Sequence, residues 1–276
     1  MNNKLAVRTI SGIVFAVVML ACLLFNQFLF GALILFIMTV MMSEFYKMTM
    51  GDNYRFSRLL AIAGGWIAFI LVFCHCAYGM HVKFICLSVV PMLVVMINSL
   101  YVKDKSEFGK FSFIYSGLLY IALPLVLSNL IAFHGDVFNT LLLLCFFVII
   151  WCSDVGAYVF GMAWGQKYGK KLAPAISPKK SWIGFWGGMF FAVLASVVLN
   201  LTGVFTFPLI HCVILAILMD VAGVYGDLFE SQWKRYCDVK DSGNIIPGHG
   251  GMLDRFDSAL FAIPVGAIYL ALLNLL

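Results

Sequence analysis

Long apolar stretches separated by short polar gaps repeat along the whole chain. A helix that crosses a bilayer needs about 20 mostly apolar residues, and nine stretches approach or reach that length. They cover roughly 9–25, 28–43, 59–77, 84–101, 112–133, 138–160, 183–201, 206–226 and 257–275. The pattern predicts an all-α integral membrane protein with about nine transmembrane helices.

The basic residues alternate between the gaps. Of the 18 Lys and Arg residues, 17 fall at the N-terminus or in the gaps after the second, fourth, sixth and eighth stretches. Only Lys83 falls on the other side. Because cytoplasmic loops of membrane proteins carry an excess of Lys and Arg, the alternation predicts a cytoplasmic N-terminus and an external C-terminus.

Composition excludes the soluble and disordered classes. The 276 residues are 63% hydrophobic and 11% charged, which is too few charges to cover a water-facing surface or to keep a chain unfolded. We expect a single polytopic membrane domain over 1–276. In it, 1–135 supplies N-terminal helices and 136–276 carries the catalytic site on its helices and cytoplasmic loops.

The eight cysteines are scattered, mostly inside the apolar stretches. Cys74-His75-Cys76 is the one cluster, and it lacks the second pair of ligands that a zinc site needs. These thiols are therefore interpreted as small apolar side chains.

Two carboxylates lie inside predicted membrane helices, where a charge is costly and by default marks a functional site. Asp154 lies toward the cytoplasmic end of the sixth helix, beside the small residues Ser153, Gly156 and Ala157, which let another helix or a ligand approach. The alternative is a buried Asp paired only for packing. Asp220 lies deeper than the acidic residues that follow it, either supporting them or simply paired.

Ser177-Pro178-Lys179-Lys180 precedes the seventh helix. Ser followed by Pro is typical of an N-cap and the first helical position. Two lysines in a first turn oppose the helix dipole unless an anion binds there, so the segment predicts a phosphate site. The alternative is that the lysines only anchor the helix at the membrane surface.

Residues 220–257 hold seven of the 13 acidic residues. The predicted topology brings Asp227 and Asp254 to the same cytoplasmic boundary, and Asp257 follows Asp254 on one helix face. Hard carboxylate oxygens gathered at a membrane surface suit Mg²⁺. Gly250 and Gly251, next to His249, let backbone N–H groups approach a phosphate.

Several motifs in this half of the chain resemble the signature of the phosphatidate cytidylyltransferases, also called CDP-diacylglycerol synthases. The resemblance covers roughly 151–258. Its motifs are Ser177-Pro178-Lys179-Lys180-Ser181-Trp182, Gly226-Asp227-Leu228-Phe229-Glu230-Ser231, Ser231-Gln232-Trp233-Lys234-Arg235, Lys240-Asp241-Ser242-Gly243 and Pro247-Gly248-His249-Gly250-Gly251-Met252-Leu253-Asp254-Arg255-Phe256-Asp257. The chain departs from the family at two positions. The family usually has a smaller aliphatic residue in place of Trp233, and it often has Glu in place of Ile183.

The resemblance implies condensation of CTP with phosphatidic acid, giving CDP-diacylglycerol and pyrophosphate, with Mg²⁺ as cofactor. By analogy Asp227 and Asp254 are the metal ligands, Asp257 lies close by, and one or two cations are the alternatives. His249 is assigned to phosphate binding or proton shuttling. The expected catalytic residues are Asp227, Asp254, Asp257, His249 and Lys240. Further charge and polar contacts for the substrates are expected from Asp154, Ser177, Lys179, Lys180, Lys234, Arg235, Gly250, Gly251 and Arg255.

The expected partners are CTP, phosphatidic acid and the bilayer, with no nucleic acid. For the oligomeric state, a monomer and a homodimer are both open alternatives. We expect a bacterial inner (cytoplasmic) membrane and an active site that faces the cytoplasm. Another Mg²⁺-dependent lipid-phosphate transferase or a CTP-dependent lipid kinase would use the same groups. An ion-coupled transporter would instead show inverted repeats and mid-membrane carboxylates, whereas most carboxylates here gather at one face.

Overall fold

The computed structural model of the chain describes residues 2–103, 105–134, 137–248 and 250–276. Within them, eight helical segments are long and apolar enough to cross a membrane, and Thr9–Phe25 is a shorter apolar helix. Each of the nine predicted stretches falls on one of these segments, so the prediction of an all-α membrane protein is confirmed. The chain forms two compact units.

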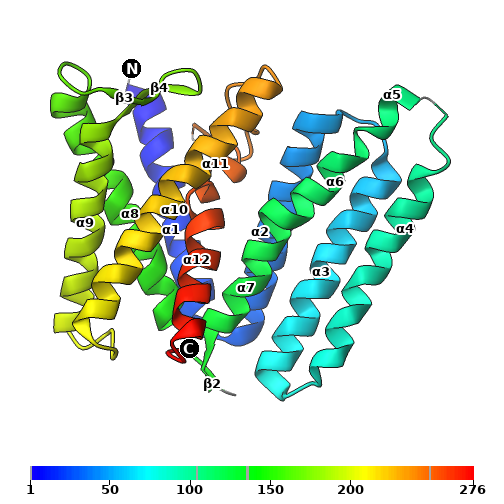
Figure 1. Cartoon of the computed structure of the whole chain (residues 1–276), viewed down its shortest axis with the longest axis horizontal. Helices are drawn as coiled ribbons and strands as arrows, with labels where there is room; N and C mark the ends of the chain where they lie inside the picture. The colour runs from blue at the N-terminus through cyan, green and yellow to red at the C-terminus, as the bar shows by residue number, and fades with distance from the viewer. Residues whose placement is uncertain (1, 104, 135–136, 249) are drawn as a thin grey trace. The chain divides into compact units, whose positions relative to one another are not determined.

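The first unit consists of Met1–Asn139 and Val239–Arg255, and its helices run from blue to green in Figure 1. Residues Phe111 to Ala132 form one apolar segment in which a π-helical turn joins two α-helices. The elements of this unit before residue 139 are α1 (Asn2–Phe25), α2 (Gln27–Met50), α3 (Arg55–Tyr78), η1 (Val82–Ser88), α4 (Val89–Ser99), α5 (Lys105–Phe108), α6 (Phe111–Gly117), η2 (Leu118–Ala122), α7 (Leu123–Ala132), β1 (Phe133–His134) and β2 (Val137–Phe138).

Local sequence explains where α2 begins. The side chain of Asn26 accepts hydrogen bonds from the backbone N–H groups of Phe28 and Leu29, both at 2.9 Å. Asn at this position satisfies N–H groups that have no partner inside the helix. The helix buries a row of apolar side chains and continues to Met50. Its end lies seven residues beyond the end of the predicted apolar stretch.

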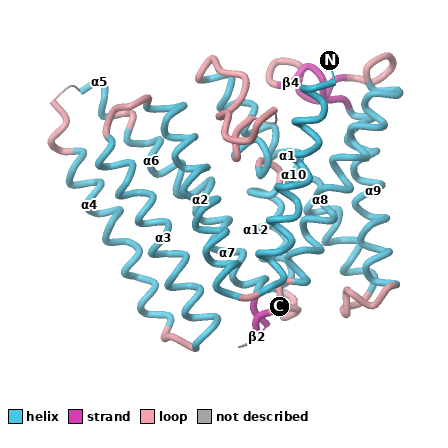
Figure 2. The backbone as a smooth tube through the Cα atoms, turned by 180° about the vertical axis from the view of Figure 1, so that it is seen from behind, coloured by secondary structure: helices cyan, strands magenta, loops and turns pink. Residues whose placement is uncertain are grey.

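The second unit consists of Thr140–Asp238 and Phe256–Leu276. Its two short strands pair antiparallel as a hairpin ahead of α9, seen in magenta in Figure 2. Its elements are α8 (Leu141–Phe160), η3 (Gly161–Gly165), β3 (Lys171–Ala173), β4 (Ser177–Ser181), α9 (Trp182–Leu201), α10 (Leu209–Tyr236) and α12 (Ala259–Leu272). The four-residue helix α11 (Leu253–Phe256) lies where the chain passes from the first unit to the second.

Glycines allow the helices of the second unit to pack closely. A Cβ at Gly156 on α8 would lie 2.5 Å from the carbonyl oxygen of Gly187 on α9. A Cβ at Gly226 on α10 would lie 2.5 Å from the carbonyl oxygen of Asp257, which precedes α12. No side chain fits at these distances. The expectation that the small residues of the sixth helix admit another helix is confirmed.

Candidate active site

A cavity of about 530 Å³ lies within the second unit. Apolar side chains such as Ile149, Met219 and Phe185 line one part of it. A polar part contains Ser153, Asp154, Lys179, Lys180, Ser181, Asp220, Asp227 and Ser258. Such a cavity offers apolar surface and charged groups together, as an amphipathic ligand requires.

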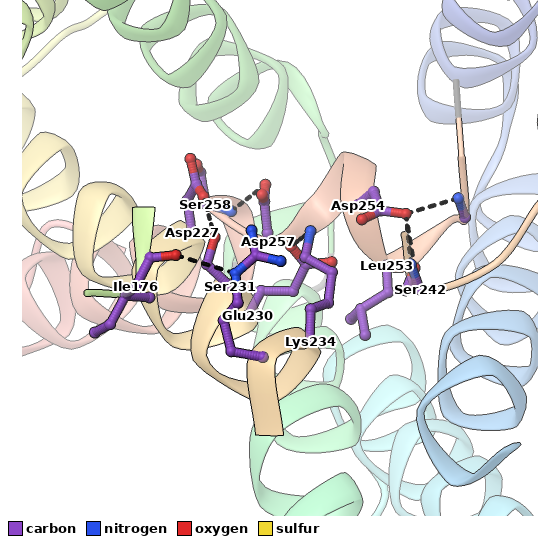
Figure 3. Close-up of polar contacts among 12 residues, drawn as sticks. Ile176, Asp227, Glu230, Ser231, Lys234, Ser242, Leu253, Asp254, Asp257 and Ser258 are labelled. Atoms are coloured by element: carbon purple, nitrogen blue, oxygen red, sulfur yellow. Dashed lines mark hydrogen bonds and ion pairs between the residues drawn. The ribbon is translucent and has the colours of Figure 1, made fainter. Parts of the chain in front are cut away.

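The central contact of the polar part is an ion pair. The Nζ atom of Lys180 lies 2.6 Å from Oδ2 of Asp227, and both side chains are partly exposed. The hydroxyl group of Ser231, one turn later on α10, donates to Oδ1 of Asp227 at 3.3 Å, a contact drawn in Figure 3. Both oxygens of Asp227 therefore have partners that hold the carboxylate in place.

Two more carboxylates lie near this pair. The carboxyl group of Asp257 is close enough to Asp227, Asp154 and Lys180 to interact electrostatically with each, and its Oδ1 accepts from the backbone N–H of Ser258 at 2.7 Å. Asp154, Asp227 and Asp257 thus bring three carboxyl groups together near the two lysines of the cavity, Lys179 and Lys180. An arrangement of this kind favours a cation, because like charges repel at short range.

Lys179 and Lys180 reach the cavity from a strand. Ser177–Ser181 forms β4, which pairs with β3 so that Lys171 is opposite Ser181. The N-cap of α9 is Ser181, whose hydroxyl oxygen accepts from the N–H of Gly184 at 3.2 Å. The prediction that Ser177 and Pro178 begin the helix is therefore wrong, and the two lysines do not lie in its first turn.

The hairpin is tied to the rest of the second unit by side-chain contacts. The amide of Gln166 donates to the carbonyl oxygen of Lys179 at 2.8 Å and accepts from Lys171 at 3.0 Å. At the end of α10, Nε of Arg235 donates to the carbonyl oxygen of Ile176 at 3.3 Å. Arg235, which we expected to contact a substrate, thus holds the hairpin turn.

Lys234 is also engaged within the protein. Its Nζ lies 2.5 Å from Oε2 of Glu230, one turn earlier on α10, and Glu230 is fully buried. Breaking such a pair would leave a buried charge uncompensated. The structure therefore gives Lys234 a partner inside its own helix, and Figure 3 shows this pair beside Ser231.

Ser153 and Asp220 also line the cavity. The hydroxyl of Ser153 on α8 donates to Oδ1 of Asp220 on α10, and both residues are buried. Asp220 has therefore a hydrogen-bond partner on the neighbouring helix. The sequence predicts one of two roles for Asp220, support for the acidic cluster or pairing within the protein, and the contact with Ser153 fits either role.

Asp254 belongs to the first unit. Its Oδ2 accepts from the N–H of Ser242 at 3.0 Å, from the Ser242 hydroxyl at 2.9 Å and from the N–H of Gly251 at 2.8 Å. Gly250 adopts φ +86°, and a Cβ there would lie 2.8 Å from the same oxygen. Asp254 thus holds Ser242 and Gly251 together, and we call the described residues around them, 242–248 and 250–254, the Asp254 loop. Asp257 lies in the turn after α11 and has different partners.

The remaining predicted residues are located as follows. Lys240 and Arg255 are exposed in the first unit. Gly251 is buried, and any side chain there would collide with Ser242. His249 lies outside the described residues, so its predicted role stays a prediction.

Glu44 on α2 belongs to none of the sequence motifs described above. Its carboxylate accepts from the backbone N–H groups of Met252 and Leu253, each at 3.0 Å. It is the only acidic residue among the first 51, and it follows an apolar stretch directly. A carboxylate directly after a membrane-spanning apolar stretch indicates a functional residue, so the sequence contains a signal for Glu44. The sequence does not show that its hydrogen-bond partners lie about 200 positions later.

The oxygen donors of the second unit suit Mg²⁺. This ion is usually bound through one or two carboxylates together with substrate phosphates and water. Among the residues that the structure describes, no three Asp, Glu, His or Cys side chains are already arranged to hold a metal. Asp227, with Asp257 and Asp154 nearby, fits an ion that shares its coordination with a substrate.

Comparison with known proteins gives a consistent result. The model of the cytidylyltransferase family matches residues 6–273. A phosphatidate cytidylyltransferase of Bacillus subtilis is 35% identical over 192 residues, which cover 68% of this chain and 68% of that protein. Phosphatidate cytidylyltransferases of Staphylococcus saprophyticus and Staphylococcus haemolyticus are 43% and 41% identical over 119 residues, or 45% of their own length. The chain therefore belongs to the cytidylyltransferase family.

Proposed function

We propose that the cavity of the second unit is where this member of the cytidylyltransferase family carries out its reaction. The reaction is transfer of the cytidylyl group of CTP to phosphatidic acid, which yields CDP-diacylglycerol and pyrophosphate for phospholipid biosynthesis. The observation that supports the location is the Lys180–Asp227 ion pair in a cavity whose other walls are apolar.

The two substrates explain why such a cavity is needed. Phosphatidic acid has a charged headgroup and two acyl chains, whereas CTP is a soluble polyanion. Apolar walls next to Lys179 and Lys180 let the lipid keep its chains in an apolar environment while its phosphate meets the nucleotide. Because both reactants are anionic, the positive groups of the hairpin lower the repulsion between them.

The bond changes follow from the products. An oxygen of the lipid phosphate forms a bond to the α-phosphorus of CTP, and the bond from that phosphorus to the bridging oxygen of the β-phosphate breaks, so that pyrophosphate leaves. The attacking phosphate already carries about −1.5 to −2 charge near pH 7, so no side chain has to remove a proton. The task of the protein is to orient the two phosphates in line.

The metal assignment is part of this proposal. Asp227 would hold Mg²⁺, with Asp257 and Asp154 near enough to contribute, and Asp254 enters from the sequence resemblance. Bound Mg²⁺ neutralises charge that develops on the phosphate oxygens. Lys180 would exchange its contact with Asp227 for a contact with a phosphate when the substrates arrive.

The protein is a multi-pass membrane protein. We further propose that it resides in the inner (cytoplasmic) membrane with the cavity open to the cytoplasm. The alternation of basic residues supports this orientation, since 17 of 18 fall on one predicted side. Labelling of single cysteines placed at Lys83 and at Lys167 from either side of sealed vesicles would test it, because the two must react from opposite sides.

An assay of purified protein separates the candidate reactions. With CTP, Mg²⁺ and phosphatidic acid, we expect equal amounts of pyrophosphate and CDP-diacylglycerol, and no product when the lipid is left out. A CTP-dependent lipid kinase would instead release CDP and phosphorylate a lipid alcohol. Formation of CDP, or pyrophosphate release without the lipid, would overturn the proposed activity.

A further inference from the structure

The carboxylate of Glu44 makes three contacts with the loop that carries Asp254, all within the first unit. Two are the hydrogen bonds from the N–H groups of Met252 and Leu253. The third comes from the hydroxyl of Ser242, which donates to Oε2 at 3.4 Å. Each carboxylate oxygen thus receives a backbone donor from residues immediately before Asp254.

The loop is shaped to admit this carboxylate. A Cβ at Gly243 would collide with Glu44, and a Cβ at Gly251 would lie 2.7 Å from Oε2 of Glu44. Only glycine allows the backbone to approach so closely at both positions. The close approach of Glu44 therefore requires glycine at two separate positions of the loop, Gly243 and Gly251.

Glu44 and Asp254 share a partner. The hydroxyl of Ser242 lies 2.9 Å from Oδ2 of Asp254 and 3.4 Å from Oε2 of Glu44. Bringing two carboxylates this close is unfavourable unless their hydrogen bonds offset the repulsion. A purely structural cap at this loop would not need a second negative charge beside Asp254, since a neutral acceptor avoids that repulsion.

We infer that Glu44 is a positioning residue for the reaction, because it fixes the loop that orients Asp254. This inference rests on the proposed function, in which Asp254 contributes to Mg²⁺ binding. Glu44 acts through the backbone of Met252 and Leu253 and does not itself touch a substrate. Its role is comparable to that of the outer groups that orient metal ligands, whose loss costs roughly 10- to 100-fold in affinity or activity.

Glu44→Gln is the sharpest variant. It preserves shape, but its amide nitrogen donates and cannot accept, so one of the two backbone N–H groups loses its acceptor. We expect kcat to fall by about 10- to 100-fold. The Mg²⁺ concentration for half-maximal activity rises, while KM for CTP and for the lipid at saturating Mg²⁺ stays within about twofold. Asp52→Asn, in the exposed turn after α2, is the matched control and leaves all these values unchanged.

A second measurement does not depend on turnover. Mn²⁺ suits the same oxygen ligands as Mg²⁺, and its binding to the resting protein can be followed by electron paramagnetic resonance. Glu44→Gln should weaken Mn²⁺ binding about tenfold or more, whereas Asp52→Asn should not. Unchanged Mn²⁺ affinity, or a KM change with constant kcat, would overturn the inference.

A second variant guards against misfolding. Gly243→Ala leaves Glu44 in place, but the three atoms nearest to its Cβ all belong to the Glu44 side chain, so it should push the loop away from Glu44 and reproduce the loss of kcat and of Mn²⁺ affinity. If Glu44→Gln does not purify as a monodisperse protein, the outcome for Gly243→Ala decides. Wild-type protein that makes no CDP-diacylglycerol would refute the proposed function. Active wild type with variants indistinguishable from it would refute the role of Glu44 alone.

Discussion

Lys180 Nζ and Asp227 Oδ2 lie 2.6 Å apart and join the hairpin before α9 to the middle of α10. The pair lies in the cavity, where an ammonium group stands beside a carboxylate that a metal ion would also contact. Partly exposed pairs of this kind contribute little to folding. Their effect is therefore expected in substrate binding.

Replacing Lys180 tests this directly. Lys180→Ala should raise KM for CTP or for phosphatidic acid about tenfold or more, since a charge-assisted hydrogen bond contributes about 1.5–3 kcal/mol. Steady-state kinetics in mixed micelles would measure it. Lys167→Ala, which replaces an exposed lysine in the turn ahead of the same hairpin, is the control and should change neither KM. A Lys180→Ala protein that inserts poorly but binds substrates normally would favour a role in anchoring.

Asp227→Asn removes the proposed metal ligand while keeping its shape. We expect kcat to fall by more than the roughly 10- to 100-fold cost of losing an outer partner of a metal. Asp238→Asn is the matched control because Asp238 is exposed beyond the same helix and has φ 53°, which Asn adopts readily. Near-normal turnover of Asp227→Asn at low Mg²⁺ would show that the metal is held elsewhere.

Asp254→Asn should abolish turnover and leave membrane insertion intact, because one charge of 13 acidic residues hardly affects topology. It should also loosen the loop at Ser242 and Gly251, whose N–H groups donate to Oδ2 of Asp254. Hydrogen exchange of peptides from this loop, measured together with activity, separates the two effects. If Asp254→Asn keeps full activity while hydrogen exchange in the loop becomes faster, the role of Asp254 is purely structural.

Close packing of α8 on α9 gives a stability prediction. Gly156→Ala should destabilise the protein by about 1–3 kcal/mol, an effect that the better helix propensity of Ala, about 1 kcal/mol, only partly offsets. Thermal unfolding in detergent would measure it. Gly109→Ala is the control, since nothing lies within 4 Å of a Cβ there. Equal melting temperatures for the two variants would contradict the tight contact at Gly187.

Hydropathy was sufficient to predict the helices. The stretch 59–77 corresponds to Arg55–Tyr78, and 206–226 corresponds to Leu209–Tyr236. The ends were less predictable where a helix continues past the apolar stretch. Tyr236 lies ten residues beyond the predicted end, because α10 extends through polar residues that contact the hairpin and one another.

Residue patterns were less reliable where distant segments decide local structure. Ser177-Pro178 is a good helix start by itself, but pairing of β4 with β3 places it in a strand. Glu44 gave no motif because its partners lie 208 and 209 positions away. Such contacts depend on tertiary folding, and a single sequence does not display them. The roles of Asp227 and Asp254 in metal binding stay predictions.

The route of the chain has a consequence for dissection of the protein. After α10 the polypeptide leaves the second unit, contributes Val239–Arg255 to the first, and returns for α12. The signature-bearing half is thus not a detachable module. A fragment that starts at Thr140 would carry every recognisable motif, yet its Met252 and Leu253 would have no α2 to dock on. The N-terminal helix α2, which carries no family motif, thus supports the segment in which the family motifs are densest.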